Sequence, residues 1–175
     1  MIRYVIIGMQ RSGTSVLHLS LASHPSVSCV IAEVDPLTLF GLGGRAFAWG
    51  NDVATNTVPG RNACDVFDFL TGADSDIERK CFGVKVAIAN SNQAFALERL
   101  SEPTFSGIKI VRIKRKDTLA QVASLLKSRK QNVWGQFARE VSDEQRNEPA
   151  PIYISKGAFV DAALNKLRVE SILDE

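Results

Sequence analysis

Residues 4–17 read Tyr-Val-Ile-Ile-Gly-Met-Gln-Arg-Ser-Gly-Thr-Ser-Val-Leu, and this stretch decides the fold. Residues 4–8 form a short continuous apolar run, which is typical of a strand buried on both faces. Residues 9–13 are turn-prone, and residues 14–23 predict a helix that stops before Pro25. A strand, a glycine-bounded loop and a helix in this order predict an α/β domain that opens with a buried strand.

The rest of the chain continues the alternation of strands and helices. Further strands are predicted at 27–31, 82–88 and 108–113, and further helices at 64–70, 93–100, 117–129, 132–141 and from Ser155 to about 173. Residues 34–61 are rich in Gly, Asn and Pro and predict a long excursion with a short helix near 37–40, and residues 142–151 predict a polar connector. We therefore expect one domain, 1–175, with a three-layer α/β/α fold and a mainly parallel sheet.

Ligands of such sheets bind beyond the carboxyl ends of the strands, and the loop after the first strand is suited to an anion. Unpaired backbone N–H groups at a helix N-terminus attract phosphate, and Gly13 lets the backbone approach it closely. Ser12, Thr14 and Ser15 add hydroxyl donors, and Arg11 adds a planar cationic fork. The spacing resembles a Walker A loop, but Thr14 stands in the place of its lysine, which disfavours an ATPase or GTPase. The alternative is a tight turn with an incidental arginine.

Positive charge is concentrated in residues 109–130. The chain carries a net charge of +2, whereas this segment alone carries +7 and the remainder −5. Its basic residues are Lys109, Arg112, Lys114, Arg115, Lys116, Lys127, Arg129 and Lys130. A local basic cluster on an otherwise acidic chain suggests either a compact polyanionic ligand or a solvated face, and the small total charge does not suggest a nucleic-acid partner.

The helix that follows the 108–113 strand brings a serine near this basic cluster. Asp117 is its predicted cap, and its predicted apolar face consists of Leu119, Val122, Ala123 and Leu126. Ser124 lies two turns into the helix, where its hydroxyl and the basic strand end could hold a second phosphate. The alternative is a solvated basic edge with an ordinary helix cap.

Glu33 follows the predicted 27–31 strand, at the carboxyl end of the sheet. A hydroxyl nucleophile needs its proton removed, and a nearby carboxylate can accept it. Asp35 is the competing candidate, and a surface role is the alternative for Glu33. His18 and His24 are expected to be structural.

Composition excludes several other classes. No apolar run reaches the length of a membrane helix, and no secretory signal precedes the first strand. Cys29, Cys64 and Cys81 show no metal-ligand spacing and suggest free thiols, so we expect a cytoplasmic protein.

Three separated segments together resemble the sulfotransferase superfamily, and most of all its bacterial trehalose-type members. They are Gln-Arg-Ser-Gly-Thr-Ser-Val-Leu at 10–17, Phe-Gly-Val-Lys at 82–85, and Lys-Asp-Thr-Leu-Ala-Gln-Val-Ala-Ser-Leu at 116–125 followed by Gln-Asn-Val-Trp at 131–134. The likeness extends over residues 3–134. Family members usually continue further, which makes the chain a minimal member, a C-terminally truncated piece or an inactive form.

The resemblance implies a P-loop NTPase-like sulfotransferase fold and the donor 3′-phosphoadenosine 5′-phosphosulfate (PAPS). The loop residues Arg11, Ser12, Gly13, Thr14 and Ser15 would bind the 5′-phosphosulfate, with Arg11 also catalytic, and Ser124 would bind the 3′-phosphate. The family's arginine in that second segment falls on Lys116, so Lys116 or Arg115 would complete the 3′-phosphate site.

The same resemblance makes Glu33 the catalytic base and gives Lys85 a counterpart whose role does not follow from the sequence. No metal is implied. The acceptor would be a small molecule or a glycan, and its hydroxyl would belong to a carbohydrate or glycolipid. Phe47 and Trp49 are candidates to line the acceptor site. Two other functions remain open: a non-catalytic domain that binds a nucleotide or partner, and a P-loop nucleotide kinase.

Overall fold

The computed structural model describes residues 1–28, 31–34, 36, 46–48, 51–53, 78–131 and 153–174. The strands are β1 (Ile2–Met9), β2 (Val27–Ser28), β3 (Ile31–Val34), β4 (Ala46–Ala48), β5 (Asn51–Val53), β6 (Cys81–Ile88) and β7 (Ile108–Ile113). The helices are α1 (Thr14–Ala22), α4 (Ser91–Ala96), α5 (Thr118–Gln131) and α6 (Lys156–Asp174), with short 3-10 helices η2 (Leu97–Ser101) and η3 (Pro103–Phe105).

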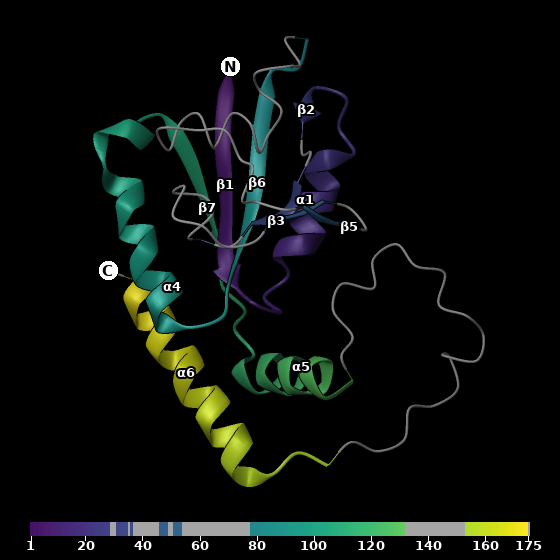
Figure 1. Ribbon diagram of the computed structural model, residues 1–175, viewed down its shortest axis with the longest axis vertical. Helices are drawn as coiled ribbons and strands as arrows, with labels where there is room; N and C mark the ends of the chain where they lie inside the picture. The colour runs from purple at the N-terminus through teal and green to yellow at the C-terminus, as the bar shows by residue number, and fades with distance from the viewer. Residues whose placement is uncertain are drawn as a thin grey trace, which may run out of the picture.

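The strands form one mixed but mainly parallel sheet. Their order is β5-β4-β3-β6-β1-β7, and β2 also pairs with β6. β1 lies between β6 and β7 and is parallel to both, whereas β4 and β5 add an antiparallel extension beside β3. The carboxyl ends of β1, β6 and β7 therefore meet at one edge, and α5 lies beyond that edge (Figure 1).

Helices pack on both faces of the sheet. Val5, Ile7 and Met9 of β1 belong to a buried cluster that includes residues of α4, η2 and α6, such as Val169. The alternate residues of β1, such as Ile6, belong to a second cluster against α1. Because successive side chains of a strand point to opposite faces, α1 and α6 lie on opposite sides of the sheet (Figure 1). This confirms the predicted α/β class with a mainly parallel sheet and is compatible with three layers.

The central strands β1 and β6 form where the sequence predicts apolar runs, and most of their residues are buried. β7 lies at the edge of the sheet and has no buried residue. The predicted strand 108–113 is confirmed as β7, and the strand 82–88 is β6 with one more residue at its start. The predicted caps are also present: Asp117 Oδ1 accepts a hydrogen bond from Ala120 N at 2.8 Å, and Ser155 Oγ accepts one from Ala158 N at 3.2 Å.

Other elements differ from the prediction. The 27–31 strand is two pieces, β2 and β3, with β2 ending at Ser28. The 93–100 helix is α4 followed by the 3-10 helix η2, and the part of 34–61 that the structure describes includes strands β4 and β5. The expected helices at 37–40, 64–70 and 132–141, and the connector at 142–151, lie outside the described residues.

The apolar face predicted for α5 is wrong at two of its four positions. Leu119 is 66% exposed and Ala123 is also exposed, whereas Gln121, Val122, Leu125 and Ser128 are buried. The helix is turned so that the Gln121 amide reaches the loop after β1, where its Nε2 donates to the Gln10 carbonyl at 2.8 Å. A polar contact with the loop thus orients α5 against its hydrophobic pattern.

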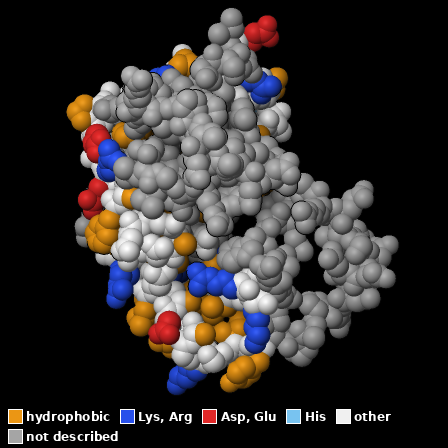
Figure 2. All heavy atoms as spheres, viewed as in Figure 1, with side chains coloured by type: hydrophobic (Ala, Val, Ile, Leu, Met, Phe, Trp, Pro, Cys, Tyr) orange, Lys and Arg blue, Asp and Glu red, His pale blue; other side chains and the backbone are white. Residues whose placement is uncertain are grey.

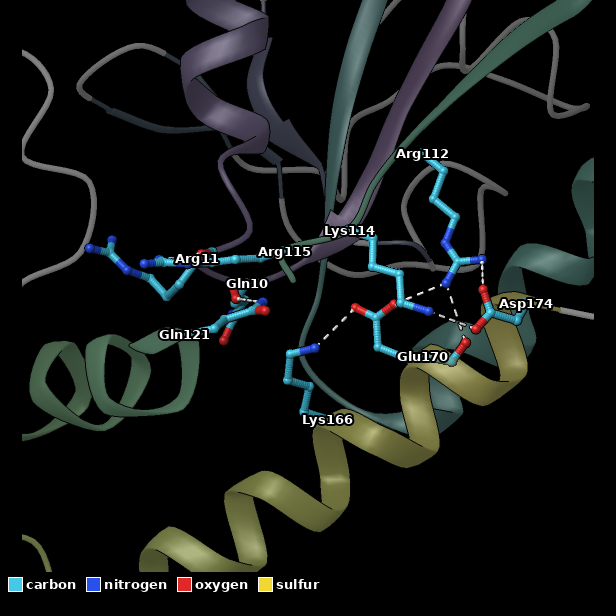
Figure 3. Close-up of polar contacts among 9 residues, drawn as sticks. All are labelled: Gln10, Arg11, Arg112, Lys114, Arg115, Gln121, Lys166, Glu170 and Asp174. Atoms are coloured by element: carbon cyan, nitrogen blue, oxygen red, sulfur yellow. Dashed lines mark hydrogen bonds and ion pairs between the residues drawn. The ribbon is translucent and has the colours of Figure 1, made fainter. Parts of the chain in front are cut away.

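The last helix is held against the edge strand β7 by ion pairs. Arg112 Nη2 donates to Glu170 Oε2 at 2.9 Å and its Nη1 to Asp174 Oδ1 at 2.6 Å (Figure 3). Arg112 Nη1 also donates to the Leu173 carbonyl. Lys114 Nζ donates to the second Asp174 oxygen at 2.8 Å. Arg112 thus donates to the Leu173 carbonyl, at the end of α6 where carbonyls have no partner within the helix. The helix dipole favours a positive charge at this end. Among the described helices, none combines the length and hydrophobicity needed to cross a membrane.

Candidate anion-binding site

The loop between β1 and α1 has the backbone of an anion cradle. Arg11 and Gly13 both have positive φ, 64° and 102°, and Arg11 is the only non-glycine residue in the described part of the chain to do so. A left-handed arginine is uncommon and marks a loop whose surroundings hold it in that shape. The helix N-cap is Gly13, which has no side chain to cap the first turn.

That first turn leaves donors available. Within the described residues, the N–H groups of Gly13, Thr14 and Ser15 have no backbone acceptor, whereas Ser12 N bonds the Met9 carbonyl at 3.1 Å. The Ser12 hydroxyl is buried and has no hydrogen-bond partner among the residues that the structure describes. Unsatisfied donors at a helix N-terminus provide both direction and charge for an anion.

Gly8 is what allows the loop to fold back so tightly. A Cβ at Gly8 would lie 2.7 Å from Ser12 Oγ and 2.8 Å from both the Ile113 carbonyl and Thr14 Cγ2. Ile113 is the last residue of β7, so the close approach also sets the distance between the loop and the start of the β7–α5 connection. Only glycine fits there without displacing backbone.

Side chains from α5 and from the β7–α5 connection meet this loop. Arg11 Nε donates to Ser124 Oγ at 3.0 Å, and Arg115 Nη1 donates to the Arg11 carbonyl at 3.4 Å. The Gln121–Gln10 hydrogen bond joins α5 to the same loop (Figure 3), and the three contacts together hold α5 against it. Four residues singled out in the sequence, Arg11, Ser124, Arg115 and the neighbouring Lys116, therefore lie at one end of the sheet.

The basic cluster is divided between two tasks. Arg112 and Lys114 are bonded to carboxylates of α6, so they are structural in this arrangement. Lys116 is exposed and forms no ion pair with another described residue, and Arg115 likewise pairs with no carboxylate there. Of the four cations at the end of β7, two therefore have no carboxylate partner in the described part of the chain. The sequence could not distinguish them, because the partners of Arg112 and Lys114 are about 60 residues away in the chain.

A cavity of about 350 Å³ opens beside these cations, between the β7–α5 connection and α6. Its lining includes Arg115, Lys116 and Thr118 on one side and Lys166 and Glu170 on the other. Figure 2 shows separate Lys and Arg side chains among hydrophobic and acidic ones on the visible face at this end of the molecule. The cations Lys114, Arg115, Lys116 and Lys166 line this cavity together with the carboxylates Glu170 and Asp174.

On the other side of the loop, a buried lysine joins two further predicted site residues. Lys85 of β6 is 5% exposed, and its Nζ donates to Ser15 Oγ at 2.8 Å and to Glu33 Oε2. The Glu33 side chain is 33% exposed. Glu33 lies within β3, one residue before its end, whereas the sequence placed it just after a strand. Lys85 was identified from the sequence only by resemblance, although a lysine within an apolar buried strand is itself a signal of function.

The remaining residues that the sequence singled out either form no described contact with the loop after β1 or lie outside the described residues. Phe47 belongs to β4, where it pairs in register with Glu33, but its side chain is not described. Asp35 and Trp49 lie outside the described residues. His18 is fully buried in α1, and His24 Nδ1 accepts a hydrogen bond from Ser26 N at 3.1 Å, consistent with structural roles. Among the described residues, no group of three His, Cys, Asp or Glu side chains could hold a metal ion.

Comparison of the chain with protein-family models, with curated proteins and with solved structures finds no match. The functional argument therefore depends on the geometry of this loop and its neighbours.

Proposed function

We propose that the protein is a PAPS-dependent sulfotransferase with a P-loop-like, three-layer fold, transferring a sulfuryl group to an acceptor hydroxyl on a carbohydrate or glycolipid. The observation that carries the proposal is the Arg11–Ser124 hydrogen bond. It joins the loop after β1 to α5, the two segments that would hold the two anionic ends of one nucleotide. A ligand that carries phosphate at both its 3′ and 5′ positions matches such a pair of adjacent anion sites.

The loop residues fit the 5′-phosphosulfate end of this donor. The free N–H groups of the first turn of α1 and the unpartnered Ser12 hydroxyl supply donors, and Arg11 supplies charge. Ser124, Arg115 and Lys116 then lie on the α5 side, where the 3′-phosphate would be held. Neither of the two cations, Arg115 and Lys116, pairs with a carboxylate of the described residues, so their charge supports a site for the 3′-phosphate, and Ser124 adds a neutral hydroxyl.

The transfer itself follows from the chemistry of the donor. The acceptor oxygen forms a bond to sulfur as the bond from sulfur to the bridging 5′-phosphate oxygen breaks, and adenosine 3′,5′-bisphosphate leaves with that electron pair. Glu33 accepts the proton of the acceptor hydroxyl, and its Oε1 has no hydrogen-bond partner among the described residues. Arg11 and the amides of Gly13 and Thr14 stabilise the charge that develops on the leaving oxygen, without any need for a metal.

The same geometry disfavours a nucleoside triphosphatase or kinase. Ser15 occupies the position at which a Walker A serine binds Mg²⁺. Here its Oγ accepts a hydrogen bond from the Lys85 ammonium, which would repel a divalent cation at that atom. Thr14 also replaces the lysine that such loops use for the β- and γ-phosphates.

A transfer assay tests the activity. PAPS labelled in its sulfuryl group is incubated with the protein and a panel of monosaccharides, disaccharides and glycolipids. The labelled product is then separated from the remaining PAPS. Transfer of label to a sugar supports the proposal. Tight binding of PAPS with neither transfer nor hydrolysis would instead indicate the nucleotide-binding domain that lacks catalysis.

A further inference from the structure

The environment of Lys85 has a consequence beyond the assignment of a donor and a base. The ammonium is almost completely buried, and both of its described partners, Ser15 and Glu33, are polar groups of the candidate site. These partners lie 70 and 52 residues from Lys85 in the chain, on α1 and β3. In the described structure Ser15 and Glu33 share no hydrogen bond with each other.

The direction of these hydrogen bonds determines what the partners can do. An ammonium only donates, so Ser15 Oγ must accept from Lys85. The hydroxyl hydrogen of Ser15 is then left to point at an anion in the loop. In the same way Lys85 occupies one oxygen of Glu33, which leaves the other to meet an acceptor hydroxyl.

We propose that Lys85 is a positioning residue that couples the donor loop to the catalytic base, so that donor affinity depends on the charge of Glu33 through this one ammonium. The inference deepens the proposed sulfotransferase function and relies on it. A group buried with two partners redistributes its hydrogen bonds when either partner changes. An anion bound next to Ser15 draws the ammonium toward the loop and weakens its hold on Glu33. Loss of the Glu33 charge leaves the ammonium free to favour the anion.

A double-mutant cycle on donor-product affinity measures this coupling. Adenosine 3′,5′-bisphosphate is titrated by calorimetry into the wild type, Glu33→Gln, Lys85→Met and the double variant. We expect Glu33→Gln to tighten binding at least about fivefold when Lys85 is present and less than about twofold in the Lys85→Met background. Direct repulsion between Glu33 and the anion would give the same factor in both backgrounds and would refute the coupling.

Lys80 provides a matched control. It is exposed and immediately precedes β6, at the opposite end of the strand from the site. Lys80→Met therefore removes the same charge from the chain and should leave the effect of Glu33→Gln unchanged. If Lys80→Met abolishes that effect as well, net charge and not the Lys85 contacts is responsible, and the inference falls.

Two further outcomes separate this inference from the function on which it relies. If the wild type does not bind the bisphosphate, both proposals fail. If it binds but the effects of Glu33→Gln and Lys85→Met on affinity are additive, only the coupling is refuted. Should Lys85→Met fail to fold, as thermal unfolding would reveal, the cycle of Ser15→Ala with Glu33→Gln takes its place. Because those two residues bond only to Lys85 in the described site, a non-additive result supports the coupling and an additive one overturns it.

Discussion

Arg11 Nε lies 3.0 Å from Ser124 Oγ, although 113 residues separate the two in the chain. The contact crosses from the loop after β1 to the second turn of α5, at the edge where parallel strands end. Arg115 reaches the same loop at the Arg11 carbonyl. The two anion sites inferred from separate parts of the sequence are thus neighbours.

Replacement of Arg11 by Ala is expected to lower sulfuryl transfer at least roughly tenfold, which corresponds to about 1.4 kcal/mol of barrier. The loss follows from removing the charged fork at the position where negative charge develops. The measurement is the steady-state rate of labelled sulfate transfer. Arg168→Ala, on the exposed surface of α6, is the matched control, and equal rates in the two variants would contradict the assignment.

Ser124→Ala should weaken the discrimination between PAPS and adenosine 5′-phosphosulfate, which lacks the 3′-phosphate. A lost hydrogen bond to a charged group corresponds to about 1.5–3 kcal/mol, so the preference should fall roughly tenfold or more. Competition binding with both nucleotides measures it. Arg115→Ala and Lys116→Ala, compared in the same way, show which cation contacts the 3′-phosphate. If none of the three variants changes the preference, the second anion site lies elsewhere.

Glu33→Gln should reduce transfer at least roughly tenfold while leaving the protein folded, because an amide cannot accept the hydroxyl proton. The rate constant for transfer at saturating donor is the relevant quantity. Glu98→Gln, an exposed carboxylate of η2, controls for loss of one negative charge. Turnover near that of the wild type in Glu33→Gln would mean that another group acts as base.

Gly8→Ala should destabilise the protein and weaken anion binding together. The added methyl would press on the Ile113 carbonyl and on Ser12 and Thr14, a crowding that typically costs about 1–3 kcal/mol. Gly13→Ala provides a comparison, because it meets no atom within 4 Å but carries the strain of φ 102°. Urea unfolding and nucleotide titration of both variants test this. Unchanged stability in Gly8→Ala would show that the loop is not tightly packed.

Attachment of α6 to β7 should weaken in acid. Hydrogen bonds from Lys114 and then Arg112 hold the pKa of Asp174 below its ordinary value near 3.8. A carboxyl whose pKa is lowered on folding stabilises the folded state above its unfolded pKa, and this contribution is lost as the pH falls through the folded pKa. The loss is therefore expected below about pH 4.

Amide hydrogen exchange at the end of α6 measures this, since local opening is faster when the ion pairs are lost. Asp174→Asn should raise exchange at neutral pH and reduce the acid dependence in that segment, where Glu170 still pairs with Arg112. A wild-type exchange profile, corrected for intrinsic rates, that does not change between pH 6 and the acid limit would rule out the role of Asp174.

The strands β1, β6 and β7 and two helix caps could be predicted because local pattern determines them, whereas β4 and β5 were not predicted. The apolar runs of β1, β6 and β7 and the capping oxygens of Asp117 and Ser155 depend on neighbours in sequence. The orientation of α5 could not, because a single amide, Gln121, bonds to Gln10 across 111 residues. The periodicity of apolar residues indicates which face of a helix is buried by hydrophobic contacts. It does not indicate a hydrogen bond between side chain and backbone of distant segments.

The site was predictable in its residue types and not in its connections. The loop motif and Ser124 could be singled out from the sequence, and the structure brings them together. The use of Arg112 and Lys114 for α6, and the bridge that Lys85 makes between Ser15 and Glu33, depend on pairings between distant segments. Charge composition suggested a polyanionic ligand or a solvated face for the basic cluster, and it gave no sign that Arg112 and Lys114 form ion pairs with α6.

The most direct test is a calorimetric titration that compares adenosine 3′,5′-bisphosphate with Mg-ATP on the wild type and on Ser124→Ala. The account predicts saturable binding of the bisphosphate, weakened in the variant, and little or no binding of Mg-ATP. Tight Mg-ATP binding together with no response to the bisphosphate would contradict it and favour a nucleotide kinase.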